Sequence, residues 1–105
     1  MSRVEPHRSR QRLDAVVRGR VQGVGFRVFA LREAMTLELD GHVSNEADGS
    51  VRVVAEGPRA DLEALLGRLE EGPPAALVDR VAASFEPARG LPAGFRIESR
   101  GHPGD

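Results

Sequence analysis

The chain has 105 residues, of which 15 are basic and 16 acidic, so its formal net charge is −1. This length accommodates one domain, and 40% hydrophobic with 30% charged residues is the balance of an ordinary folded protein rather than a disordered polyelectrolyte. The absence of cysteine excludes disulfides, thiolate metal sites, iron–sulfur clusters and a cysteine nucleophile. Every basic residue is arginine, which also excludes a P-loop lysine and a Schiff-base lysine.

Other function classes are disfavoured by what the sequence lacks. No apolar run approaches the ~18–20 residues of a spanning helix, and the start of the chain has no signal-like apolar stretch. His7, His42 and His102 stand too far apart for a ligand pair. We therefore expect a cytoplasmic protein that uses no metal and no cofactor.

Charge divides the chain into three parts. Residues 1–12 carry four arginines against one glutamate and show no apolar periodicity, which predicts a flexible basic N-terminal arm. Such an arm could touch nucleic acid or acidic lipid, but four arginines favour a solvated tail, with neither nucleic acid nor membrane as a partner. We expect a folded domain over 13–99 and a flexible C-terminal tail over 100–105.

Hydrophobic periodicity predicts the first half of the domain. Apolar residues alternate from Leu13 to Val17, as in a half-buried strand. A glycine-rich turn follows, and apolar residues then recur at helical spacing from Phe26 to Leu37. The segment 41–45 is typical of a short strand, and Asp48-Gly49 is typical of a hairpin turn.

The second half repeats this order. The further elements expected are a strand over 51–55, a helix carrying leucines from 62 to 69, a strand over 78–85 and a short strand over 95–97. The order strand–helix–strand–strand–helix–strand describes a βαββαβ sandwich, the ferredoxin-like α+β fold, with an antiparallel sheet and both helices on one face. This fold hosts enzymes, RNA binders and regulatory modules, so it does not determine a function.

The turn at 19–25 is the first candidate for a functional site. Its three glycines allow successive backbone N–H groups to converge, and the following helix adds free N–H groups and the positive end of its dipole. Arg27 lies in the first turn of that helix, where its guanidinium could meet a phosphate. Composition alone leaves two interpretations open, a structural turn and an anion-binding loop.

Asn45 is the second candidate. Its amide could orient a water molecule at the end of the second strand. Sequence spacing alone favours the other interpretation, a polar residue entering the Asp48-Gly49 hairpin.

The segments Gly19–Arg27 (GRVQGVGFR), Gly41–Asn45 (GHVSN), 48–51 (DGSV) and 56–58 (EGP) together resemble the acylphosphatase family from about Leu13 to Ile97. The resemblance implies a ferredoxin-like hydrolase that cleaves carboxyl–phosphate anhydrides of small-molecule acyl phosphates without metal. It implies that Arg27 binds the phosphate and that Asn45 positions the attacking water. It also implies a phosphate-binding loop formed by Gln22, Gly23, Val24, Gly25 and Phe26.

Two positions depart from the family pattern: Glu38 replaces a glycine often found where the first helix ends, and His42 replaces an aromatic residue. Asp48 and Glu56 are expected to be turn and strand-surface groups rather than general bases. We expect a monomer. The alternative function is a module on the same fold that binds a phosphate or a ligand like carbamoyl phosphate without turnover.

Overall fold

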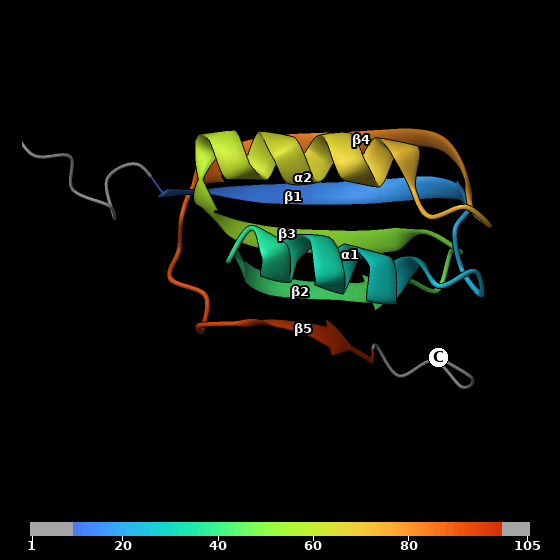
Figure 1. The fold of residues 1–105 in the computed structure, drawn as a ribbon, viewed down its shortest axis with the longest axis horizontal. Helices are drawn as coiled ribbons and strands as arrows, with labels where there is room; N and C mark the ends of the chain where they lie inside the picture. Colours follow the sequence, from blue (N-terminus) through green and yellow to red (C-terminus); the bar gives the residue numbers. More distant parts are fainter. Residues whose placement is uncertain (1–9, 100–105) are drawn as a thin grey trace, which may run out of the picture.

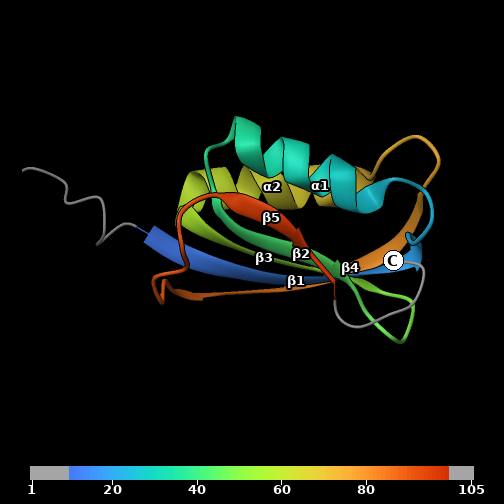
Figure 2. The same ribbon diagram turned by 90° about the horizontal axis from the view of Figure 1, so that it is seen from below.

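The protein folds into one layer of five strands covered by one layer of two helices, in a computed structural model that describes residues 10–99 (Figure 1). In chain order the elements are β1 (Arg10–Arg20), α1 (Phe26–Thr36), β2 (Asp40–Asn45), β3 (Val51–Pro58), α2 (Arg59–Glu71), β4 (Leu77–Pro87) and β5 (Phe95–Glu98). Figure 2 shows both helices on the same face of the sheet. The predicted ferredoxin-like α+β fold is confirmed. Neither helix has the length and apolar character needed to cross a bilayer.

The sheet is mixed, which corrects the prediction of a purely antiparallel one. The strand order is β4-β1-β3-β2-β5, and only the last pair, β2 with β5, is parallel. The chain leaves β4 at one edge, crosses one end of the sheet and enters β5 at the opposite edge (Figure 1). Because β5 begins at the end where β4 stops, it runs against β4 and therefore with β2.

The sheet begins earlier than the predicted domain boundary at residue 13. Arg10 lies opposite Pro58 in β3, and Gln11 lies opposite Pro87 in β4. Residues 10–12 are therefore part of β1 and do not belong to an arm. The rest of the predicted arm and the predicted tail at 100–105 lie outside the described residues.

The core confirms the predicted apolar faces. Leu13, Ala15 and Val17 of β1 are fully buried beneath the helices. Three leucines of the α2 stripe, Leu62, Leu65 and Leu69, are also fully buried, whereas Leu66 is only partly so. Burying a side chain of this size stabilises the fold by about 1.5–3 kcal/mol. Packing of these two faces against each other places α2 over the β1 side of the sheet.

The end of α1 contains a left-handed residue that is not glycine. Glu38 has φ 57°, the only positive φ among the described non-glycine residues. The N–H of Leu39 donates to the carbonyl of Ala34 at 2.9 Å, and the N–H of Glu38 donates to that of Met35 at 3.0 Å. These two bonds form a Schellman motif, whose left-handed position is normally glycine because a Cβ there is strained.

Replacing Glu38 with glycine should therefore stabilise the protein. We expect Glu38→Gly to raise the free energy of unfolding by about 1 kcal/mol, since the strain of the left-handed conformation disappears. Denaturant unfolding measures this difference. Glu63→Gly, at an exposed position inside α2, is the control and should lower the free energy of unfolding by about 1 kcal/mol. Destabilisation by both changes would contradict the assignment of strain to Glu38.

Glu56 is buried, contrary to the expectation of a strand-surface group. It lies on the face of β3 opposite the helices with no solvent exposure. Its carboxylate accepts N–H bonds from residues 89–91 at 2.7, 3.0 and 2.9 Å, and Arg12 donates to it at 3.3 Å. The loop that carries the chain across the sheet is thus fastened to β3 by one carboxylate.

Burial alone would raise the pKa of Glu56, but the N–H groups of residues 89–91 and Arg12 outweigh it and lower the pKa below its ordinary value of 4.5. The ionised group therefore contributes stability above about pH 4.5, and this contribution is lost as the pH falls through the lowered pKa. We expect Glu56→Gln to reduce the free energy of unfolding by about 2–3 kcal/mol at pH 7. The difference between wild type and variant should shrink in acid.

Unfolding curves between pH 7 and pH 3 check this expectation. Glu63→Gln is the control because its carboxylate makes an exposed ion pair with Arg59, whose removal should cost at most about 0.5 kcal/mol. A pH-independent difference between wild type and Glu56→Gln would mean that the charge of Glu56 is not what fastens the loop.

Candidate active site

The glycine-rich turn between β1 and α1 takes its shape from backbone requirements. A Cβ on Gly19 would lie 2.2 Å from the carbonyl oxygen of Leu77, so only glycine allows β1 and β4 to approach there. Gly23 and Gly25 have φ 74° and 81°, in the left-handed region, with open space around them. These two glycines turn the backbone without filling the space in front of it.

The start of α1 has no side-chain cap. Gly25 is the N-cap, so this position has no side chain to cap the helix, and no acidic residue lies in the first turn. The N–H of Phe29 donates to the carbonyl of Gly25 at 3.0 Å and opens the helical ladder. The N–H groups that precede it have no acceptor within the helix, and they carry the positive end of the helix dipole. An anion bound at this helix start would accept hydrogen bonds from the free N–H groups and would be stabilised by the positive end of the dipole.

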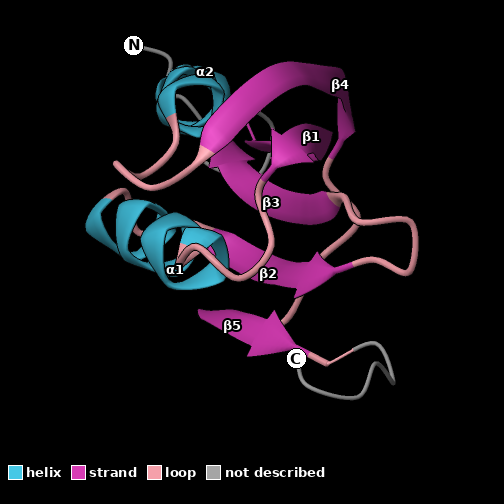
Figure 3. Ribbon diagram, turned by 90° about the vertical axis from the view of Figure 1, so that its right-hand side faces the viewer, coloured by secondary structure: helices cyan, strands magenta, loops and turns pink. Residues whose placement is uncertain are grey.

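A cavity of about 150 Å³ opens beside this helix start. Its lining residues are Val21, Gly23, Gly25, Phe26, Arg27, Val28, Asn45 and Ile97. Figure 3 faces the end of the sheet where the β1–α1 loop, the start of α1 and the end of β2 meet. Among the described lining residues, Arg27 alone carries a formal charge, and it is positive. The cavity is therefore suited to an anion.

The cavity brings together the two predicted catalytic residues. Arg27 comes from the first turn of α1 and is half-buried, whereas Asn45 is the last residue of β2 and is 6% exposed. Asn45 lies opposite Val51 in the register of β2 with β3, on the face that the helices cover. The fold thus places a guanidinium and a carboxamide on one cavity although they stand far apart in the sequence.

The predicted phosphate-binding loop divides into two groups. Gly23, Gly25 and Phe26 line the cavity, and Phe26 does so with a side chain that is itself buried in the core. The side chain of Gln22 points away, because its Nε2 donates to the carbonyl oxygens of Glu46 at 2.8 Å and Ser50 at 2.9 Å. These bonds tie the loop to the turn that follows Asn45.

Val24 also turns away from the cavity. Its side chain is partly buried and packs against the hydrophobic core. Gln22 and Val24 can therefore reach a ligand only with their backbone groups, while their side chains hold the loop in place.

Three lining residues were missed by reasoning from the sequence. Val21, Val28 and Ile97 contribute hydrocarbon to the cavity and carry no chemistry of their own. Val28 gives one usable signal, since it is apolar but stands outside the helical stripe that begins at Phe26. Ile97 gives none, because only the placement of β5 beside β2 brings it to the site.

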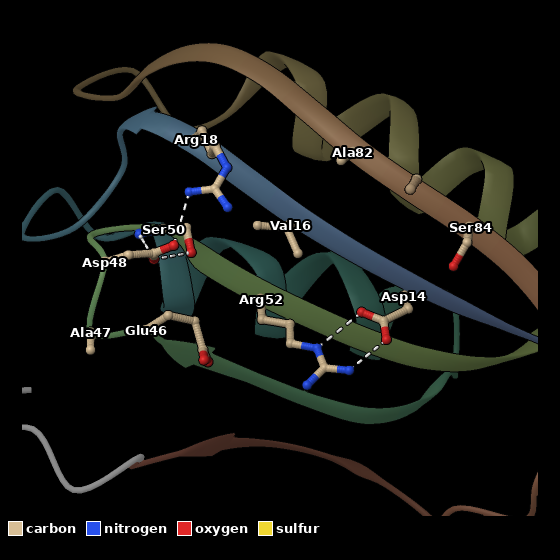
Figure 4. A pocket seen from close by; sticks show the side chains of 11 residues that line it. Asp14, Val16, Arg18, Glu46, Ala47, Asp48, Ser50, Arg52, Ala82 and Ser84 are labelled. Carbon is tan, nitrogen blue, oxygen red and sulfur yellow. Dashed lines mark hydrogen bonds and ion pairs between the residues drawn. The ribbon is translucent and has the colours of Figure 1, made fainter.

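A larger cavity of about 700 Å³ lies on the opposite face of the sheet (Figure 4). Four of its five charged side chains are held in two ion pairs: Arg52 donates Nε to Asp14 at 3.0 Å, and Arg18 donates to Asp48 at 3.0 Å. The fifth, Glu46, accepts from the hydroxyl of Ser44. The hydrogen bond from Arg52 lowers the pKa of Asp14, so this carboxylate is ionised at neutral pH. Asp48 also accepts from Ser50 and is the turn group that was expected.

His42, the second departure from the family pattern, is not part of the site. It faces the side of the sheet away from the helices, with Nδ1 3.6 Å from Oε1 of Glu98. Burial lowers the pKa of His42, although Glu98 opposes this. Across residues 10–99, no cluster of three or more His, Cys, Asp or Glu side chains is arranged to hold a metal ion.

The acylphosphatase family model matches residues 13–97. Acylphosphatase of Salinibacter ruber is 47% identical over 87 residues, which are 83% of this chain and 92% of that protein. Acylphosphatase of Thermus thermophilus is 48% identical over 86 residues, 82% of this chain and 97% of that protein. The structure of an acylphosphatase from Coxiella burnetii superposes with a TM-score of 0.84 at 33% identity, covering 91% of this chain and all of that one. This chain belongs to the acylphosphatase family.

Proposed function

We infer that the chain is an enzyme, an acylphosphatase that hydrolyses carboxyl–phosphate anhydrides to a carboxylate and phosphate. The observation that carries this inference is the single small cavity on which an uncapped helix start, Arg27 and Asn45 converge, in a chain of that family. The substrate is a small-molecule acyl phosphate.

We propose that the phosphoryl group lies at the start of α1. The backbone N–H groups of the loop from Gln22 to Phe26 would donate to its oxygens, and Arg27 would pair with its negative charge. In phosphoryl transfer, charge spreads over the three equatorial oxygens, so donors that are fixed before the reaction stabilise the transition state. Gly23 and Gly25 leave the space that this requires, since nothing lies within 4 Å of a Cβ built on either.

Asn45 would hold the attacking water. Its carboxamide has one acceptor and two donors, which suffice to orient a water molecule. The water oxygen bonds to phosphorus, the bond from phosphorus to the carboxylate oxygen breaks, and the proton of the water passes to the phosphate. Because a carboxylate is a good leaving group, it departs without being protonated, and the site needs no histidine, lysine or cysteine base.

The test of this function is release of carboxylate from benzoyl phosphate at neutral pH, with and without a chelator. An acylphosphatase that needs no metal should turn over equally fast in both conditions. A folded wild type with no turnover above the spontaneous rate would favour the alternative, a module that binds phosphate-like ligands without catalysis. Turnover abolished by the chelator would overturn the metal-independent mechanism.

The remaining expectations are part of the same proposal. A site formed by α1, β2, β5 and one loop of the same chain is consistent with a monomer. We also propose that the protein acts in the cytoplasm without nucleic acid or membrane. Light scattering coupled to size exclusion tests the monomer. A salt-dependent RNA-binding signal that disappears on removal of residues 1–9, which leaves β1 intact, would overturn the absence of a nucleic-acid partner.

A further inference from the structure

We propose that Val28 and Ile97 form the binding site for the acyl group, and that the enzyme therefore prefers acyl phosphates whose acyl group is apolar. This inference rests on the proposed function and adds to it the class of substrate. It concerns the part of the cavity that lies beyond the groups which hold the phosphate.

The first observation is the exposure of these two side chains. Across residues 10–99, four large hydrophobic side chains are exposed: Val28 at 42%, Met35 at 59%, Leu77 at 63% and Ile97 at 37%. A single exposed hydrophobic residue needs no explanation, because much of any protein surface is apolar. Two of these four, however, line the one cavity that contains Arg27 and Asn45.

The second observation is how the fold brings them there. Val28 directly follows Arg27 in the first turn of α1. Ile97 lies opposite Val43 in the parallel pairing of β5 with β2, so it shares the helix-covered face with Asn45, two residues further along β2. The two side chains therefore approach the cavity from different elements, one next to each predicted catalytic residue.

The lining residues fall into two groups that differ in polarity. The loop glycines and Arg27 offer N–H groups and positive charge, which suit the phosphate. Val28 and Ile97 offer only hydrocarbon, and so do the buried side chains of Val21 and Phe26, each 1% exposed. Within the described part of the chain, no acidic side chain lines the cavity. An apolar acyl group would cover exposed hydrocarbon there, whereas a polar acyl group would lose hydrogen bonds with water and find no new partners.

The test compares benzoyl phosphate with acetyl phosphate as substrates of Val28→Thr, Ile97→Thr and the double variant. Threonine keeps the β-branched shape suited to each position and introduces a hydroxyl. For each substitution we expect kcat/KM for benzoyl phosphate to fall about 10-fold, chiefly through KM, which is the scale on which apolar pockets discriminate. The value for acetyl phosphate should change less than about 2-fold, because its methyl group barely reaches this surface.

Leu77→Thr is the matched control, since Leu77 is the most exposed of the four side chains and does not line the cavity. It should leave both substrates unaffected. Equal losses for both substrates, or no loss for either, would overturn the proposal. If wild type hydrolyses neither substrate, the proposed function fails instead, so the two failures are distinguishable.

Inhibition by non-hydrolysable analogues gives a second measurement that does not depend on turnover of benzoyl phosphate. Benzylphosphonate should inhibit wild-type hydrolysis of acetyl phosphate more strongly than methylphosphonate does, and the double variant should lose this difference. Equal inhibition of wild type by the two phosphonates would contradict an apolar acyl site.

Discussion

Arg27→Ala should lower kcat/KM for benzoyl phosphate by about 10³-fold, the low end of what an arginine contributes to phosphoryl transfer. Among residues 10–99, Arg27 is the only charged side chain lining the cavity, so no neighbouring cation of that part of the chain can replace it. The loss corresponds to about 4 kcal/mol of transition-state stabilisation. Arg27→Lys should recover only part of it, because an ammonium cannot donate two parallel hydrogen bonds to a phosphate as a guanidinium does.

The control is Arg32→Ala, which removes the same charge from an exposed position further along α1. It should keep nearly full activity, which would exclude a general effect of net charge or of helix content. Initial rates at neutral pH measure both variants, and circular dichroism shows whether each is folded. A folded Arg27→Ala variant with nearly full activity would show that the site has been assigned to the wrong residue.

Asn45→Ala should lower kcat by about 10²-fold while leaving phosphate binding nearly unchanged. The reason is that misplacing a reacting group costs about this much even when the other groups are intact. Because Arg27 and the loop N–H groups remain, inorganic phosphate should inhibit the variant at the same concentration as wild type. Steady-state kinetics with phosphate as a competitive inhibitor measures both quantities.

Ser44→Ala is the matched control for the hairpin. Ser44 precedes Asn45 on β2, is also buried, and its hydroxyl donates to Oε2 of Glu46 at 2.7 Å on the opposite face of the strand. This variant disturbs the hairpin without touching the cavity, so its kcat should stay within a few-fold of wild type. If Asn45→Ala lost binding and turnover equally, and Ser44→Ala behaved alike, Asn45 would be a structural residue of the hairpin.

Most of the elements could be predicted because local periodicity reports which side chains are buried. The alternation of Val51, Val53 and Ala55 and the leucine stripe of α2 both correspond to buried faces. The left-handed turns at Gly23 and Gly25 could also be predicted, since glycine is the residue type that readily adopts a positive φ.

The direction of β5 and the burial of Glu56 could not be predicted. Glu56 alternates correctly for a solvent-facing position, and the groups that bury it are backbone N–H donors more than 30 residues away. Every residue except proline has a backbone N–H, so residue types do not indicate which N–H groups will bond to Glu56. The hydrophobic pattern of β3 therefore cannot predict its burial. The parallel pairing of β5 with β2 likewise depends on where the crossing loop ends.

The candidate site, like the fold, has parts that the sequence predicts and parts that it does not. The residue types of the loop and of Asn45 were enough to nominate an anion site and a water-orienting amide, although spacing alone favoured a structural turn and a hairpin residue. The sequence by itself determined the order of elements, their buried faces and the glycines and arginine that can meet a phosphate, because each depends on local backbone and side-chain chemistry. Only the tertiary structure decided that Arg27, Asn45, Val28 and Ile97 line one cavity, because α1, β2 and β5 become neighbours through strand pairing and helix packing that no local pattern encodes.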